Sequence, residues 1–243
     1  MLMKWKRLTK PRFLFVYPLV VWLFLVAKTT ERQLHVGLLL MVCGEALRLW
    51  ANGYVGRVKV NLTQRWRGDA KIGQLVTAGP YAYVRHPLYL GTFLIGAGFC
   101  VMVGNIWFSL AAVSLFLITY GNKMAEEDEM LEHEWGETFV AYRHAVSQWL
   151  PWRRPYRQPN GQWSWQGILA SRELKTVVWV SVAVILLYFR EELIQQRESF
   201  LAEDHVLKHG LLIALLASLI LADAIVEIRR RWKRRQAVVT AEH

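Results

Sequence analysis

Cysteine is scarce in this chain of 243 residues: only Cys43 and Cys100 occur, and both lie inside apolar runs. A thiol in an apolar run usually packs as a small hydrophobic side chain. The sequence therefore predicts no disulfide and no metal site, and it indicates no particular redox compartment.

A cleavage site for a signal peptide is also lacking. Residues 1–27 combine a basic start with an apolar stretch, as secretory signal peptides do. However, no small-residue site follows Ala27, and the next residues are KTTERQ. We therefore interpret residues 13–27 as a first membrane span that is retained.

Acidic residues are few compared with basic ones, 19 against 30, which gives a formal net charge of +11. A nucleic acid is one class of partner for such a chain. However, 54% of the residues are apolar, 12 are tryptophan, and the mean hydropathy is +0.19. This composition is typical of a polytopic membrane protein. We therefore expect the cations to face anionic lipid head groups, and we expect no nucleic-acid partner.

Apolar segments are plentiful. Each is about 15 to 18 residues long, and flanking tryptophan, tyrosine and lysine extend it toward the roughly 20 residues that a span needs. The predicted spans are residues 13–27, 34–51, 88–104, 106–120, 174–189 and 210–226. The predicted fold class is therefore all-α, a polytopic integral membrane helical bundle of about six transmembrane helices. Little more than Gly104 and Asn105 separates the third and fourth segments, which predicts a tight helical hairpin.

Lysine and arginine alternate between rich and poor connections. Residues 1–12 hold five, residues 52–87 and 121–173 hold six each, and the tail 229–235 holds six, whereas the intervening connections hold three or fewer. Cytoplasmic loops carry the excess of these residues. The pattern therefore predicts that both termini lie on the cytoplasmic side.

Polar ring and cation groups precede the third span in GPYAYVRHPLYLG, residues 79–91. They are Tyr81, Tyr83, Arg85, His86 and Tyr89. One interpretation is an aromatic and cationic belt at the membrane interface. The other is an anion-binding site, assisted by the free N–H groups at the start of a helix whose first turn contains Pro87.

An acidic cluster, EEDE at residues 126–129, follows the fourth span. Four like charges in a row are usually solvated surface, but carboxylates beside a cationic and aromatic cluster also suit a ligand with amine and hydroxyl groups. Apolar residues at intervals near three and four predict one amphipathic helix over residues 125–146, which continues the fourth span and ends before Pro151.

Ionisable residues also lie inside the second span, where Glu45 and Arg48 share a helical face. An ionisable residue in a span is a hypothesis for a functional site. The alternative is a self-contained ion pair between these two residues that orients the helix. The sequence leaves both interpretations open.

Together these segments resemble the isoprenylcysteine carboxyl methyltransferase and phospholipid methyltransferase family of integral membrane enzymes. GPYAYVRHPLYLG is similar to that family's G-P-Y-x-Y-x-R-H-P-x-Y-x-G, and EEDEMLEHEWGETFVAYRHAVSQWLP is similar to its second motif. The paired glutamates of that motif fall on Glu127 and Asp128, or on Glu126 and Glu127 one residue earlier. Trp135 and Phe139 stand where the family usually has Phe and Tyr.

The resemblance implies S-adenosylmethionine as cofactor, bound by cytoplasmic loops, and a membrane lipid or isoprenoid-like acceptor. Arg85 and Glu127 are the expected catalytic residues, and Glu45 and Arg48 are candidates for the acceptor channel. The methyl-accepting group, a carboxylate, an amine or a thiol, stays open, as does the oligomeric state. Cofactor contacts are expected from Tyr81, His86, Tyr89, Glu127 and Asp128.

Three segments follow from this interpretation. Residues 1–33 form a basic segment with the first span, residues 34–157 a methyltransferase-like core, and residues 158–243 a connecting loop, two spans and a basic tail. We expect the protein in a bacterial inner membrane with its active site on the cytoplasmic side. Two alternatives are a non-enzymatic lipid-binding membrane protein and a sterol-type membrane reductase, although no G-x-G-x-x-G fingerprint opens a helix after a strand.

Overall fold

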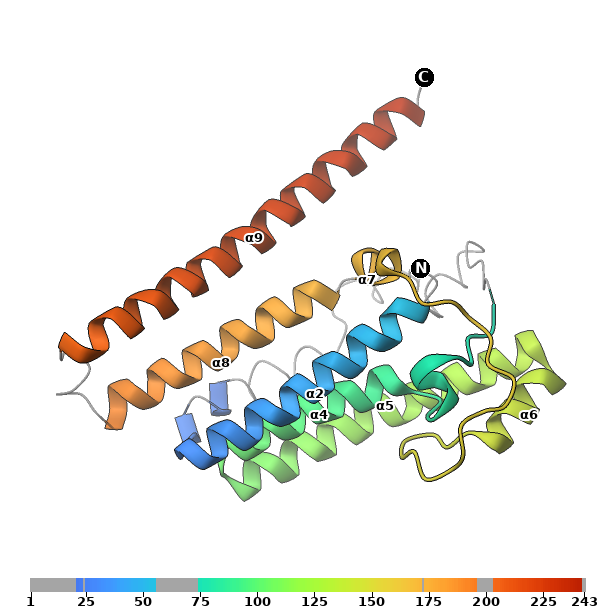
Figure 1. Ribbon diagram of the computed structural model, residues 1–243, viewed down its shortest axis with the longest axis horizontal. Helices are drawn as coiled ribbons and strands as arrows, with labels where there is room; N and C mark the ends of the chain where they lie inside the picture. Colours follow the sequence, from blue (N-terminus) through green and yellow to red (C-terminus); the bar gives the residue numbers. More distant parts are fainter. Residues whose placement is uncertain (1–20, 24, 56–73, 172, 196–202, 242–243) are drawn as a thin grey trace, which may run out of the picture. The chain divides into compact units, whose positions relative to one another are not determined.

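The computed structural model describes residues 21–23, 25–55, 74–171, 173–195 and 203–241, and their regular elements are helices. The elements in Figure 1 are α2 (Glu31–Val55), η2 (Gly79–Ala82), α4 (Pro87–Val103), α5 (Ile106–Trp135), α6 (Glu137–Ala145), α7 (Trp165–Ala170), α8 (Glu173–Gln195) and α9 (Glu203–Ala241). The chain forms two compact units, Met1–Glu173 and Leu174–His243. The predicted all-α fold is confirmed, whereas most of the predicted span 13–27 lies outside the described residues.

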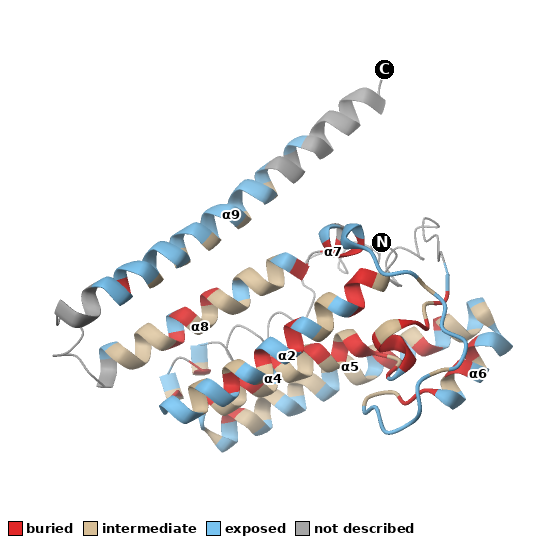
Figure 2. Ribbon diagram, in the orientation of Figure 1, coloured by how far each residue is buried: buried red, intermediate tan, exposed pale blue. Residues whose placement is uncertain are grey.

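Three helices of the described part are long and apolar enough to cross a membrane: α2, α5 and the stretch Leu207–Ile228 of α9. The helix α4 is also apolar but has only 17 residues. Most of the described side chains of α9 are exposed in Figure 2, and none of its apolar window is buried within the protein, as expected for side chains that face lipid. The protein is therefore an integral membrane protein, and the number of six spans stays a prediction.

The helix α4 contacts both α2 and α5, and its contact with α2 is the more extensive. Glycines allow this close approach. A Cβ built at Gly98 would lie 2.6 Å from the carbonyl oxygen of Gly37, and one built at Gly91 would lie 2.7 Å from that of Gly44. Small residues at a crossing let two helix backbones approach each other. The four glycines therefore fix the α2–α4 pair.

Replacing Gly98 by alanine is expected to lower the free energy of unfolding by about 1–3 kcal/mol, because the new methyl group would overlap the α2 backbone. Thermal unfolding of the purified protein in detergent measures the effect. The matched control is Gly96→Ala, since nothing lies within 4 Å of a Cβ at that position. Equal unfolding midpoints for the two variants would contradict this packing.

The predicted hairpin between the third and fourth segments is confirmed. Gly104 follows α4 with φ at 63°, a left-handed conformation that favours glycine. Asn105 then caps α5, because its side chain accepts a hydrogen bond from Phe108 N at 3.0 Å. The hairpin brings the beginning of α4 and the far end of α5 to the same end of the pair.

The expectation of one helix over residues 125–146 is wrong. The helix α5 ends at Trp135, and Gly136, with φ at 51°, separates it from α6. Gly136 N donates to Glu132 O at 2.8 Å, which ends the α5 hydrogen-bond ladder. Periodicity does not reveal this break, because the apolar spacing continues on both sides of the glycine. The break lets Phe139 and Tyr142 of α6 form a separate apolar cluster with Leu75.

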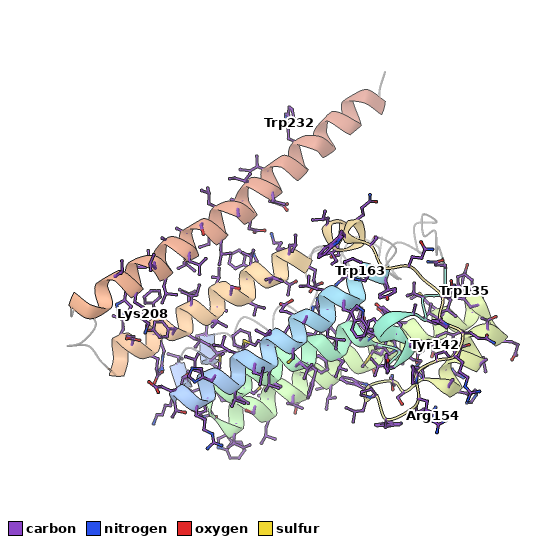
Figure 3. The ribbon with its side chains drawn as sticks, in the orientation of Figure 1. Trp135, Tyr142, Arg154, Trp163, Lys208 and Trp232 are labelled. Carbon is purple, nitrogen blue, oxygen red and sulfur yellow. The ribbon has the colours of Figure 1, made fainter. Side chains whose placement is uncertain are left out.

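The second unit contains α9 and all of α8 after Glu173, which belongs to the first unit. Near the start of α8, Lys175 Nζ lies 3.2 Å from Asp223 Oδ2, which also accepts a hydrogen bond from Trp179 Nε1 at 3.2 Å. Near the other end of α8, the ammonium group of Lys208 lies 4.8 Å from the centre of the Tyr188 ring (Figure 3). These contacts join α8 and α9 near both ends of α8.

Candidate active site

The first motif, residues 79–91, folds into the short helix η2 and the beginning of α4. Pro87 is the first residue of α4, where its missing N–H costs no helical hydrogen bond, and His86 occupies the N-cap position. Arg85 N donates a hydrogen bond to Ser147 O at 2.9 Å. This bond ties the first motif to the residues that follow α6.

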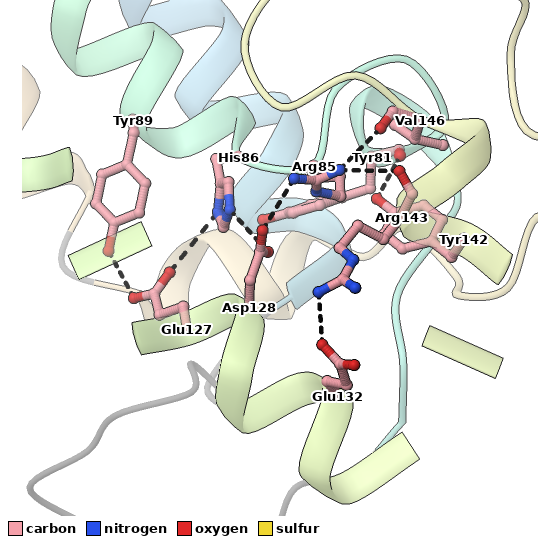
Figure 4. A network of polar contacts seen from close by, with 10 residues as sticks. All are labelled: Tyr81, Arg85, His86, Tyr89, Glu127, Asp128, Glu132, Tyr142, Arg143 and Val146. Carbon is pink, nitrogen blue, oxygen red and sulfur yellow. Dashed lines mark hydrogen bonds and ion pairs between the residues drawn. The ribbon is translucent and has the colours of Figure 1, made fainter. Parts of the chain in front are cut away.

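Two carboxylates of α5 join the second motif to the first (Figure 4). Asp128 Oδ2 accepts a hydrogen bond from Arg85 Nη2 at 2.9 Å, and Asp128 Oδ1 lies 3.0 Å from His86 Nε2. Glu127 Oε1 accepts a hydrogen bond from the Tyr89 hydroxyl at 2.5 Å, whereas Glu127 Oε2 lies 3.8 Å from His86 Nδ1. Five of the predicted site residues therefore lie in one network.

Side-chain exposure distinguishes the two possible pairs of acids. Glu126 is exposed, Glu127 is partly buried and Asp128 is buried. The pair that faces the first motif is therefore Glu127 and Asp128. Both oxygens of Asp128 contact the first motif, whereas Glu127 Oε2 is farther from His86 than a hydrogen bond allows.

Arg85 connects α5 to the end of α6. Its Nη1 donates to Arg143 O at 2.9 Å and to Val146 O at 3.1 Å, while its Nη2 donates to Asp128. Its Nε is buried and has no hydrogen-bond partner in the described part of the chain. The planar fork of a guanidinium group suits several acceptors at once. The expected contact of Arg85 with an anionic acceptor stays a prediction.

Tyr142 of α6 supports the first motif through a hydrogen bond to its backbone. Its hydroxyl donates to Tyr81 O at 2.7 Å, and both tyrosine side chains are buried. Burial raises the pKa of Tyr142 above its usual value, so the hydroxyl stays protonated and remains a donor. Trp135 packs against the cluster that contains Phe139 and Tyr142 (Figure 3). The sequence did not assign Tyr142 to the site, and the expected cofactor contact of Tyr81 stays a prediction.

Tyr142→Phe is expected to lower the free energy of unfolding by about 1–2 kcal/mol, because the Tyr81 carbonyl loses its buried donor. Differential scanning calorimetry in detergent would measure this loss. Tyr83→Phe is the control, because Tyr83 belongs to the same motif but is 42% exposed. A Tyr142→Phe variant as stable as Tyr83→Phe would show that this hydrogen bond contributes nothing.

The ionisable residues of α2 do not form the self-contained pair that was one interpretation. Arg48 pairs with Glu173, with Nε 2.5 Å from Oε1 and Nη2 3.1 Å from Oε2. Glu45 is 9% exposed, and neither of its carboxylate oxygens has a hydrogen-bond partner in the described part. The interpretation that Glu45 and Arg48 form a self-contained ion pair is therefore wrong. The sequence missed Glu173 because it lies 125 residues from Arg48, and no local pattern connects the two.

Comparisons with known proteins bear on this site. Residues 32–138 match the family model described as Phospholipid methyltransferase. The chain is 35% identical over 118 residues to human protein-S-isoprenylcysteine O-methyltransferase, covering 47% of this chain and 40% of that protein. It is 29% identical over 136 residues to the Dictyostelium discoideum protein of the same name, covering 54% of this chain and 55% of that protein. No solved structure matches the chain.

One further relative has a different name. The nickel-cobalt-cadmium resistance protein NccN of Alcaligenes xylosoxydans xylosoxydans is 30% identical over 118 residues, covering 49% of each chain. Within the described residues, no group of three or more His, Cys, Asp or Glu side chains is arranged to hold a metal ion.

The chain spans about 40% to 55% of the length of these relatives. The matched segment contains α2, α4 and α5, and with them the first motif and both carboxylates that contact it. The similarity that the two motifs indicate is confirmed: residues 32–138 of this integral membrane protein match the phospholipid methyltransferase family model, and the curated relatives are similar to the same part of the chain.

Proposed function

We propose that the protein transfers a methyl group from S-adenosylmethionine to a lipid-like or isoprenoid acceptor in the membrane. The observation that carries this proposal is the contact between the two family motifs at one end of the α4–α5 hairpin (Figure 4). The relatives named protein-S-isoprenylcysteine O-methyltransferase support the same class of reaction.

The polar groups of this network suit the proposed donor. S-adenosylmethionine supplies a methyl group on a sulfonium centre, and its amino and ribose groups need hydrogen-bond acceptors. Glu127 Oε2 is such an acceptor, while Tyr89 holds the other oxygen of the same carboxylate in place. We assign Tyr81, His86 and Tyr89 to the walls of this donor site, with Asp128 orienting the His86 ring toward it.

The contribution expected from the protein is positioning and the exclusion of water rather than covalent catalysis. A charged, water-soluble donor enters hydrocarbon only at a high cost in free energy, so its site belongs at the ends of the spans. The basic connections favour the cytoplasmic side of a bacterial inner membrane for that end and for both termini. A hydrophobic acceptor would enter laterally from the bilayer between helices, and we assign Glu45 and Arg48 of α2 to its route.

Methyl transfer from radiolabelled S-adenosylmethionine tests this function directly. The purified protein in lipid nanodiscs is incubated with a total lipid extract or with a prenylated cysteine analogue, and label in either acceptor fraction supports the proposal. Titration calorimetry with the donor and with its demethylated product supplies a second measurement. If no label is transferred and no heat of binding is detected, the protein is not a methyltransferase, and the non-enzymatic lipid-binding alternative is favoured. Binding of a nicotinamide cofactor instead would favour a reductase.

A further inference from the structure

Glu173 is a deeply buried carboxylate that lies outside the segment matched by the family. It occupies the first turn of α8 and is 2% exposed. It accepts hydrogen bonds from Arg48 Nε at 2.5 Å, from Arg48 Nη2 at 3.1 Å and from Asn52 Nδ2 at 2.7 Å. A carboxylate this buried is tolerated only where a cation and further donors compensate its charge. The three bonds therefore make Glu173 a specific partner of α2.

Arg48 transmits this contact to the beginning of α4. Its remaining terminal nitrogen, Nη1, donates to Leu88 O at 3.1 Å and to the Thr92 hydroxyl. A Cβ built at Gly91 would lie 2.4 Å from Arg48 Cγ, so the arginine stem lies directly against the α4 backbone. Tyr89, which donates to Glu127, lies in the same turn of α4.

Glu45 is a competing partner for Arg48. It precedes Arg48 by one helical turn on the same face of α2, and its buried carboxylate has no hydrogen-bond partner in the described part. A guanidinium that is only 16% exposed is strongly stabilised by a carboxylate partner. If Glu173 lost its charge, Arg48 would turn toward Glu45 and withdraw Nη1 from Leu88 and Thr92.

We propose that Glu173 is a positioning residue for the candidate active site. By holding Arg48 away from Glu45, it fixes the first turn of α4 and therefore places His86 and Tyr89 opposite the carboxylates of α5. The consequence for catalysis rests on the proposed function, whereas the positioning is a property of the fold. A residue beyond the family segment thus completes the site.

Glu173→Gln in the full chain, reconstituted in nanodiscs, tests this role. Hydrogen exchange of a peptide covering residues 86–93 should be faster than in the parent, and affinity for the demethylated donor should fall by about fivefold or more. Glu173→Asp keeps the charge and should recover part of both effects. The matched control is Glu192→Gln, which removes a partly buried carboxylate from α8, one whose Oε1 lies 3.5 Å from His209 Nε2 in the second unit.

The two measurements separate this inference from the proposed function. Unchanged exchange at residues 86–93 in Glu173→Gln would overturn the positioning role, whether or not the parent binds the donor. Exchange that rises equally along the whole chain would also overturn it, because Glu173 would then act only on global stability. Faster exchange confined to residues 86–93 supports the positioning role. This holds even if the parent protein transfers no methyl group and the proposed function is thereby ruled out.

Discussion

Glu127→Gln is expected to slow methyl transfer by about 10²- to 10³-fold, which corresponds to the loss of one preorganised charged hydrogen-bond partner. The amide keeps the size of the side chain but removes the charge that attracts the amino and ribose groups of the donor. It also weakens the short bond from the Tyr89 hydroxyl, which is 2.5 Å long in the structure. Initial rates with radiolabelled donor, together with calorimetry on the demethylated product, measure both consequences.

The control for this variant is one residue away. Glu126→Gln makes the same change in charge on the exposed side of α5, so it should methylate at close to the rate of the parent. This pair of variants separates a local role of Glu127 from the effect of net charge at the membrane surface. Equal rates for the two variants would remove Glu127 from the site.

Arg85→Lys is expected to slow methyl transfer by about 10- to 100-fold although the charge is kept. A single ammonium group cannot reproduce the bonds that Arg85 makes to Asp128, Arg143 O and Val146 O. The end of α6 would then lose part of its attachment to α5. Initial rates, the KM for the acceptor and the thermal unfolding midpoint are measured on the same preparation.

Those measurements distinguish two roles of Arg85. A raised KM for an anionic acceptor at an unchanged unfolding midpoint supports the orienting role, whereas a lowered midpoint supports the structural one. Arg143→Lys is the control, since the Arg143 side chain is 36% exposed and its pair with Glu132 should contribute little to stability. Arg85→Lys with the rate and midpoint of the parent would contradict both roles.

Local sequence signals predicted the elements that depend on neighbouring residues. The short Gly104–Asn105 connection indicated the hairpin, and the structure forms it with a left-handed glycine and an N-cap, which both act within one turn of the chain. The same kind of reasoning failed at Gly136, because apolar spacing continues through a glycine whether or not that glycine ends a helix. The predicted span 13–27 lies largely outside the described residues, and the total number of spans stays a prediction.

The sequence by itself determined the class of the protein, an all-α membrane protein with two family motifs, because composition, apolar length and residue spacing are local properties. Only the tertiary structure decided which side chains meet. The rotation of α5 about its axis turns Glu127 and Asp128 toward the first motif and leaves Glu126 exposed. The choice of Glu173 over Glu45 as the partner of Arg48 depends on chain segments 125 residues apart, and it is set by helix packing rather than by any spacing in the sequence.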